Sequence, residues 1–224
     1  LIDWAVKTKM KVLQLLPVND TIATQTWKDS YPYAAISVYA LHPIYLNMEA
    51  VGSLSNIELS QEIALRAAQL NTLPELDYEE VLKLKFQYLR AKYNEVKSTF
   101  RASKSFKSFL KSNKHWLVNY AIFSTLRDHY NTADFIKWGR YARYDDSLVT
   151  EFGKSNSVFA DSVGLYYFIQ YHLDKQLKEV TQYGRTNGVL LKGDIPFCIY
   201  RDSVDAWLFP DLFKPANFID ASIA

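Results

Sequence analysis

Two short apolar runs, each followed closely by polar residues, constrain the fold of this chain more than any other feature of its sequence. The first run spans residues 11–16, and Asn19 and Asp20 follow it. The second spans residues 189–191, and Asp194 lies three positions further on. Short apolar runs of this kind are typical of buried strands. If the strands are parallel, their carboxyl ends lie at the edge where α/β folds build their sites.

The long segment between the two runs is predicted to be helical. Asp77 has the character of an N-cap, and apolar residues recur at spacings of three and four from Leu82 to Val96, which predicts a helix over 77–100. A second helix is expected from about 112 to 126, and a shorter one near 135–138. We expect no strand between about 55 and 150.

The last third returns to a mixed pattern. Apolar residues on one face predict a helix from about 158 to 183, with Gly184 placed to end it in a left-handed cap. A short loop and the 189–191 strand follow. Helix, loop, strand and polar terminus in this order are typical of an α/β unit of a parallel sheet.

The organisation indicates a piece of a larger α/β protein. The chain begins with Leu1 instead of Met, inside an apolar stripe that predicts a helix without its beginning. We divide it into residues 1–54 with the first strand and a long loop, 55–155 as a helical insertion, and 156–224 as a helix–strand unit. A partial sheet leaves strand edges unpaired, so we expect aggregation or self-association of the isolated chain. The remainder of the fold is the expected partner in the larger protein.

Charge and composition exclude several classes of partner. Lys and Arg number 26 against 24 Asp and Glu, so a net charge of +2 gives no reason to expect nucleic acid or an anionic membrane. The longest uncharged stretch, residues 30–48, contains two prolines and many polar residues and is no membrane span. A single cysteine, Cys198, requires no oxidising compartment, so we expect a cytoplasmic protein.

Familiar nucleotide, zinc and hydrolase motifs are absent. The sequence contains no G-x-G-x-x-G, G-x-x-x-x-G-K-[ST], G-x-S-x-G, H-E-x-x-H or C-x-x-C. The four histidines lie at spacings that do not place a ligand pair on one helix face, which indicates surface or structural roles. We therefore expect neither a metal nor an organic cofactor.

Carboxylates and aromatic rings near the two strand ends remain as candidates. They are Asp20, Asp29, Tyr31, Tyr33, Asp194, Asp202, Asp205 and Trp207. Sugar sites use carboxylates to bind hydroxyl groups or move protons, and aromatic faces to cover the apolar side of a pyranose ring.

Each candidate also has a purely structural interpretation. Asp20 could cap a turn, Tyr31 and Tyr33 could pack under the loop, Asp202 or Asp205 could cap the next helix, and Trp207 could belong to the core. For any single residue, the structural interpretation is at least as probable as a role in a binding site. The joint placement of the residues after two strands favours a site.

At these residues the chain resembles the 4-alpha-glucanotransferases called amylomaltases or disproportionating enzymes. Residues 13–20 (LQLLPVND) are similar to the family's first barrel strand, and residues 29–43 (DSYPYAAISVYALHP) to its signature loop. Residues 116–126 with Trp138 are similar to its helical insertion. Residues 188–196 (GVLLKGDIP), followed by Asp202, Asp205, Trp207 and the run from Pro210 to Phe213, resemble its G-x-x-L-x-G-D-x-P block.

The resemblance implies a partial (β/α)8 barrel with a large all-helical insertion, acting on maltooligosaccharides or other 1,4-alpha-glucan. Retaining transfer in such enzymes uses two carboxyl groups about 5 Å apart. The family's Arg-x-Asp motif with the nucleophile and its later acid/base Glu are not found before Ala224. Arg143-Tyr-Asp145 matches the Arg-x-Asp pattern, but it lies in the segment that is predicted to be helical.

We therefore expect a fragment that holds substrate but is inactive alone. Its expected substrate-binding residues are Asn19, Asp20, Tyr31, Tyr33, Asp194, Pro196, Asp205 and Trp207. A non-catalytic glucan-binding module and a purely helical scaffold remain as alternatives.

Overall fold

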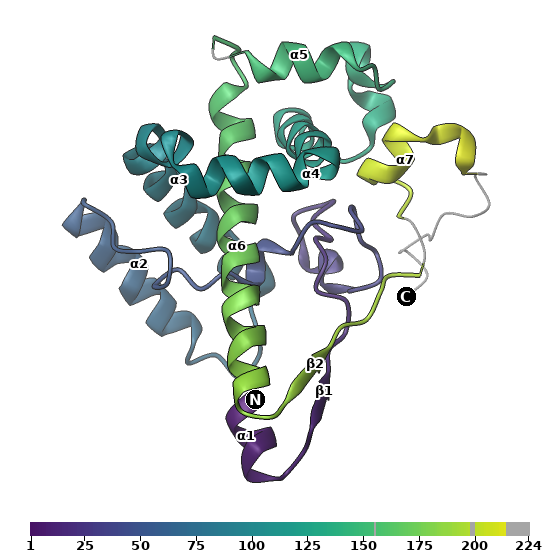
Figure 1. The fold of residues 1–224 in the computed structure, drawn as a ribbon. Coiled ribbons are helices and arrows are strands. Elements are labelled where there is room, and N and C mark those ends of the chain that lie inside the picture. Colours follow the sequence, from purple (N-terminus) through teal and green to yellow (C-terminus); the bar gives the residue numbers. More distant parts are fainter. Residues whose placement is uncertain (155, 198–199, 214–224) are drawn as a thin grey trace.

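A computed structural model describes residues 1–154, 156–197 and 200–213 (Figure 1). Helices pack around one long central helix, and two short strands extend from the helical body beside its lower half. Cys198 and residues 214–224 lie outside the described residues. The interpretation of Cys198 and of the chain end therefore stays a prediction.

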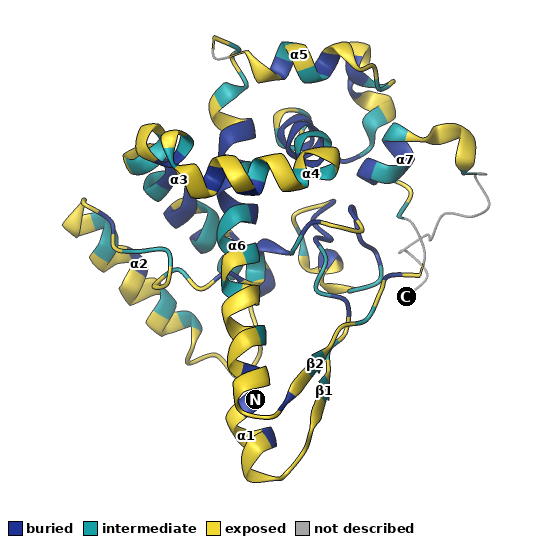
Figure 2. Ribbon diagram, viewed as in Figure 1, coloured by how far each residue is buried: buried dark blue, intermediate teal, exposed yellow. Residues whose placement is uncertain are grey.

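The two predicted strands form a parallel pair. Strand β1 spans Val12–Gln14 and β2 spans Leu190–Lys192, with Leu13 opposite Leu191. The ladder is short, and beyond it the Leu15 amide donates to the Lys192 carbonyl at 2.9 Å. Figure 2 shows the strands as largely exposed. The parallel arrangement is confirmed, and the strand at 11–16 is shorter than predicted.

A short helix at the N-terminus covers the beginning of this sheet. Helix α1 spans Ile2–Lys7 and buries Ile2 and Ala5 against Val189. Because Leu13 and Leu191 pack against the same small cluster, α1, β1 and β2 bury apolar surface together, separately from the main core. The apolar stripe at the N-terminus is therefore a helix, as predicted.

Four helices make up the predicted helical segment. They are α2 (Ile57–Leu70), α3 (Tyr78–Ala102), α4 (Lys104–Tyr130) and α5 (Ser147–Gly153). The Asp77 side chain accepts a hydrogen bond from the Glu80 amide at 3.0 Å and caps α3 as predicted. The segment from Phe135 to Lys137 is a single 3-10 turn. No strand lies between residues 55 and 154, all of which the structure describes.

Helix α4 begins eight residues earlier than predicted. Ser103 ends α3 and caps α4, because its hydroxyl accepts a hydrogen bond from the Phe106 amide at 3.2 Å. Phe106 and Phe109 then extend the buried face of α4. The prediction from 112 was wrong because it rested on the apolar residues from Trp116 onward and did not include these two aromatic residues.

Helix α6 (Ala160–Thr186) is the centre of the fold, and it does not end at Gly184 as predicted. Gly184 is a helical residue, and the left-handed glycine is Gly188, with φ of +72°. A Cβ atom at Gly184 would lie 2.9 Å from the Val189 carbonyl oxygen. The glycine is required because the chain entering β2 passes close to α6, and not because it ends the helix.

The remaining elements are short. Helix α7 spans Val204–Leu208. Single 3-10 turns are formed by Trp27–Ser30, Pro43–Tyr45, Gly139–Tyr141 and Pro210–Leu212. The long loop after β1 thus contains little regular structure, as its sequence predicts.

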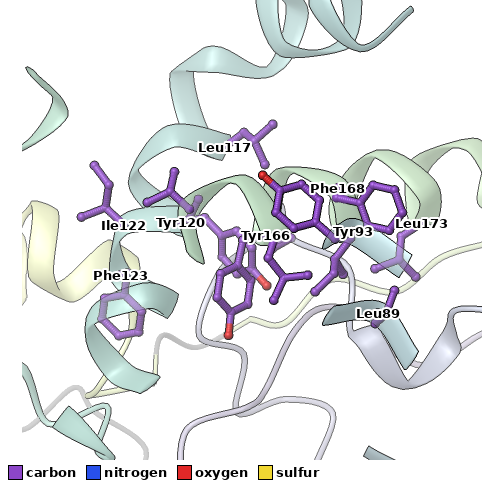
Figure 3. Packing of buried hydrophobic residues seen from close by; sticks show 14 of the residues in the cluster. Leu89, Tyr93, Leu117, Tyr120, Ile122, Phe123, Tyr166, Phe168 and Leu173 are labelled. Atoms are coloured by element: carbon purple, nitrogen blue, oxygen red, sulfur yellow. The ribbon is translucent and has the colours of Figure 1, made fainter. Parts of the chain in front are cut away.

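The core joins α3, α4 and α6. Leu89 and Tyr93 of α3, Leu117 and Tyr120 of α4, and Phe168 of α6 point toward one another (Figure 3). The same cluster extends from Ala23 in the loop after β1 to Trp207 in α7. All three predicted segments therefore contribute to one hydrophobic core.

We expect Gly184→Ala to destabilise the protein by about 1–2 kcal/mol. Alanine favours a helix, but its methyl group would collide with the Val189 backbone. Urea unfolding followed by circular dichroism measures the change. Gly153→Ala is the matched control, since no atom lies within 4 Å of a Cβ there, and we expect a neutral or stabilising effect. Equal effects of the two substitutions would contradict the close-approach explanation.

Candidate functional site

The loops that follow β1 and β2 meet at the carboxyl ends of the strands (Figure 1). The Tyr33 hydroxyl, in the loop after β1, donates a hydrogen bond to Asp194 Oδ2, after β2, at 2.8 Å. The two residues are 161 positions apart, so this contact depends on the parallel pairing of the strands. It brings together two of the residues predicted from the sequence.

Aromatic rings surround this contact. The centroid of the Tyr33 ring lies 5.8 Å from that of Tyr31 and 5.1 Å from that of Phe197. Tyr31 is 38% exposed and Phe197 is 77% exposed. The sequence analysis missed Phe197, although a large apolar residue directly after the Gly-Asp-x-Pro run was the available signal. We refer to Tyr31, Tyr33, Phe197 and Asp194 as the strand-end cluster.

The electrostatics of the cluster follow from the tyrosine–carboxylate contact. The hydrogen bond to Asp194 raises the pKa of Tyr33, and the negative charge of the carboxylate acts in the same direction. Tyr33 therefore remains a neutral donor at physiological pH. The second oxygen of Asp194, Oδ1, accepts from the Ile195 amide at 2.9 Å, at an exposed position, and from no other donor among the described residues. This carboxylate is accessible to a ligand that carries hydroxyl groups.

Asp20 lies elsewhere, in the interior. Its side chain is fully buried; Oδ1 accepts from the Ile22 amide at 3.0 Å, and Oδ2 accepts from the Tyr120 hydroxyl at 2.7 Å. Burial raises the pKa of Asp20, while the Arg127 charge and these hydrogen bonds oppose the rise. In this arrangement Asp20 organises the loop and presents no oxygen to solvent, which favours the structural interpretation of this residue.

The remaining predicted residues are divided between surface and interior. Asn19 is half-buried, and its Nδ2 donates to the Ser37 carbonyl at 3.3 Å. Pro196 is buried beside the strand-end cluster's Asp194. Asp205 accepts a hydrogen bond from the Val38 amide, and burial raises its pKa. Asn19 and Asp205 thus each have a partner in the loop after β1.

Trp207 is packed inside the protein. It is 1% exposed, its Nε1 donates to the Tyr141 carbonyl at 3.0 Å, and its ring contacts those of Phe123 and Trp138. Burial favours the core interpretation, and substrate contact by Trp207 stays a prediction. The cap of α7 is Ser203, which accepts from the Ala206 amide at 3.1 Å, and neither Asp202 nor Asp205 has that role.

Asp29 and Asp145 are also occupied locally. Both oxygens of Asp29 accept from the Thr24 amide at 3.0 Å, and Oδ2 also accepts from Gln25. Asp145 accepts from the Ser147 amide at 2.7 Å at the start of α5. Asp145 therefore stabilises the turn that leads into α5, and Arg143-Tyr-Asp145 does not lie at a strand end.

The described residues contain no group of three or more His, Cys, Asp or Glu side chains placed to hold a metal ion. Within residues 1–154, 156–197 and 200–213, no helix is long and apolar enough to cross a bilayer.

The fold is similar to that of two solved amylomaltases. The amylomaltase from Streptococcus agalactiae in complex with acarbose matches with a TM-score of 0.73 and 24% identity, over 95% of this chain and 41% of that chain. The amylomaltase from Corynebacterium glutamicum matches with a TM-score of 0.67 and 18% identity, over 92% and 28%. The structure is thus part of a (β/α)8 barrel with a helical insertion, as the sequence predicted.

Residues 1–219 match the family model for 4-alpha-glucanotransferases, and the chain belongs to this family. It is 39% identical over 214 residues to the 4-alpha-glucanotransferase DPE2 of Oryza sativa subsp. japonica, covering 96% of this chain and 22% of the relative. It is 32% identical over 225 residues to a 4-alpha-glucanotransferase of Chlamydia pneumoniae, covering 99% and 40%. The chain therefore spans less than half the length of these curated relatives.

We expect Tyr120→Phe to destabilise the protein by about 1–3 kcal/mol, because the buried carboxylate of Asp20 would lose a donor. Chemical denaturation at pH 7 measures the effect. Tyr171→Phe is the matched control, since the Tyr171 hydroxyl forms no hydrogen bond within the described part of the chain. A loss no larger than that of the control would contradict a stabilising role for the Asp20–Tyr120 contact.

The loop also contains a buried histidine with a predictable acid response. His42 Nδ1 accepts from the Ile44 amide at 3.0 Å, so the neutral ring donates through Nε2 to the Tyr78 hydroxyl at 2.8 Å. Burial lowers the pKa of His42 to about 3. The unfolded chain therefore binds a proton that the folded protein does not, and stability falls as the pH drops below 6.5.

We expect His42→Asn to reduce this acid sensitivity, because asparagine keeps an acceptor for the Ile44 amide and does not titrate. The difference in unfolding free energy between the variant and the unmodified chain should shift by about 2 kcal/mol in favour of the variant from pH 7.5 to pH 5. Urea titrations at both pH values test this. Parallel pH dependences would show that His42 is protonated in the folded state.

Proposed function

We propose that this chain supplies glucan-binding residues of a cytoplasmic 4-alpha-glucanotransferase. Such an enzyme transfers a segment of a 1,4-alpha-D-glucan to the 4-hydroxyl of glucose or of another glucan. Family membership supports the reaction class. The observation that carries the binding role is the strand-end cluster, in which an accessible carboxylate lies beside exposed aromatic rings.

The cluster has the chemistry that a glucose unit requires. The faces of Tyr31 and Phe197 can cover the apolar C–H surface of a pyranose ring. The Asp194 carboxylate can accept hydrogen bonds from sugar hydroxyl groups. In such a contact the hydroxyl group is the donor, because a carboxylate has no proton to donate. The Tyr33–Asp194 hydrogen bond orients both side chains before a ligand arrives, which lowers the entropic cost of binding.

We further propose that the catalytic Asp/Glu pair is outside this chain. A retaining double displacement needs one carboxylate to attack the anomeric carbon and a second group about 5 Å away to move the proton. Asp20 is buried with both oxygens engaged, and the oxygens of Asp29 accept backbone amides. Only Asp194 is left accessible in the strand-end cluster, and one carboxylate is insufficient. Its role in this proposal is to hold a sugar.

The remainder of the barrel is the proposed protein partner. Both strands of the pair are largely exposed, with Val12 at 50% and Leu190 at 57% (Figure 2). The relatives contain more than twice the length of this chain. Further parallel strands would bury this surface and add the catalytic carboxylates. The net charge of +2 provides no electrostatic basis for binding nucleic acid.

We expect the purified chain to bind maltotriose, and Tyr33→Ala to weaken that binding roughly tenfold through loss of a ring and of the Asp194 contact. Isothermal titration calorimetry measures the dissociation constants. Tyr183→Ala is the matched control: it removes an exposed tyrosine that likewise donates to an aspartate, Asp3, at 2.5 Å. Equal weakening by both substitutions, or no binding, would contradict the proposed site.

Turnover separates the transferase from a non-catalytic glucan-binding module. The chain alone should form neither glucose nor longer maltodextrins from maltotriose, whereas a longer protein that includes these residues and completes the barrel should form both. Products from the chain alone would contradict the proposed location of the catalytic pair. An inactive longer protein that still binds maltotriose would favour the binding module.

A further inference from the structure

A second group of aromatic side chains lies where the loop after β1 contacts α4. The Tyr39 ring is almost parallel to that of Trp116, with centroids 5.9 Å apart and an interplanar angle of 16°. It also meets the edge of His115 at 5.6 Å. Tyr39 is 54% exposed, His115 is exposed and Trp116 is half-buried. We refer to Tyr39, His115 and Trp116 as the α4 platform.

The platform does not share a ring contact with the strand-end cluster. Its members come from the loop and the helical insertion, whereas the cluster joins the loop to the segment after β2. The exposed faces of these rings leave apolar area in contact with water. A ligand that covers ring faces would remove this cost.

The neighbouring face of α4 is polar but uncharged. Five side chains recur at spacings of three and four, which places them on one side of the helix: Ser105, Ser108, Ser112, His115 and Asn119. The first four are exposed. Hydroxyl, imidazole and amide groups beside aromatic rings can exchange hydrogen bonds with a ligand that has many hydroxyl groups.

The lysines of the same helix lie on a different side. Lys104, Lys107, Lys111 and Lys114 also recur at spacings of three and four, and this row is offset by roughly a quarter turn from the uncharged row. A phosphate group or an anionic polymer would be expected to use that row. The platform itself therefore fits a neutral, hydroxyl-rich ligand.

The rings are held in position before any ligand binds. Trp116 Nε1 donates to Asn113 Oδ1 at 3.1 Å, and the indole packs against the Tyr120 ring with centroids 6.2 Å apart. The Tyr39 amide donates to the Ser37 hydroxyl at 3.2 Å. Little side-chain entropy would be lost on binding to these fixed rings.

We propose that the α4 platform is a second glucan-binding surface, which takes a neutral segment of 1,4-alpha-glucan beyond the sugars at the strand-end cluster. This inference rests on the proposed function. Tyr33 and Tyr39 are six residues apart, so their Cα atoms are at most about 20 Å apart. This span is within the length of a long maltooligosaccharide, so in this proposal a long ligand contacts both groups of rings and a short one occupies the strand-end cluster alone.

Calorimetric titration of the chain with maltotriose and with maltoheptaose tests this inference. We expect Tyr39→Ala to weaken maltoheptaose binding roughly tenfold and to leave maltotriose binding unchanged, because one stacked ring is lost only for the long ligand. Tyr39→Phe keeps the ring and should bind maltoheptaose as the unmodified chain does. His115→Ala should weaken it by a smaller factor. Tyr183→Ala is the matched surface control, and all variants should unfold at the same temperature as the unmodified chain.

Each of the other outcomes has a definite meaning. Unchanged maltoheptaose binding by Tyr39→Ala, with weakening by Tyr33→Ala, overturns the second surface and keeps the proposed function. Equal weakening of both ligands by Tyr39→Ala also overturns it, because Tyr39 would then belong to the same site as Tyr33. If the unmodified chain binds neither ligand, the proposed function fails and the second surface fails with it.

Discussion

The arrangement of the loop after β1 depends on a carboxylate placed in the core. Asp20 follows the first strand, and Tyr120 of α4, 100 residues further along the chain, donates to it. Gln170 of α6 contacts the same hydroxyl at 3.3 Å, and buried Arg127 donates to the Ile22 carbonyl at 2.7 Å. Because unpaired buried polar groups are costly, this network permits few alternative loop conformations. The helical insertion therefore determines the position of the loop.

The same constraint explains why neighbouring acidic residues have different roles. Asp20 accepts hydrogen bonds from the Ile22 amide and from Tyr120, and Asp29 accepts from backbone amides of the loop, so protein donors occupy both carboxyl groups. Asp194 follows a strand that is exposed on much of its surface, and its carboxylate meets Tyr33 at the boundary with solvent. Carboxylates that hold a loop and a carboxylate at the boundary with solvent thus lie within one region.

The sequence predicted those features that depend on neighbouring residues. Asp77 and the apolar spacing after it were sufficient for α3, because a cap and a helical face are local properties. The start of α4 was missed because Ser103 ends one helix and begins the next. Gly184 was taken as a cap because the close approach of the Val189 carbonyl cannot be read from spacing. Trp207 is buried by aromatic rings from distant segments, which no local pattern indicates.

By itself, the sequence determined the two strands, the helical insertion and the family, because these depend on short-range periodicity and on motifs in a fixed order. It also predicted Tyr33 and Asp194 as substrate-binding residues. Only the tertiary structure decided that these two residues meet, that Asp20 faces inward and that Tyr39 stacks on Trp116. The physical reason is that burial and pairing depend on side chains more than 70 positions away, whose placement follows from packing of the whole core.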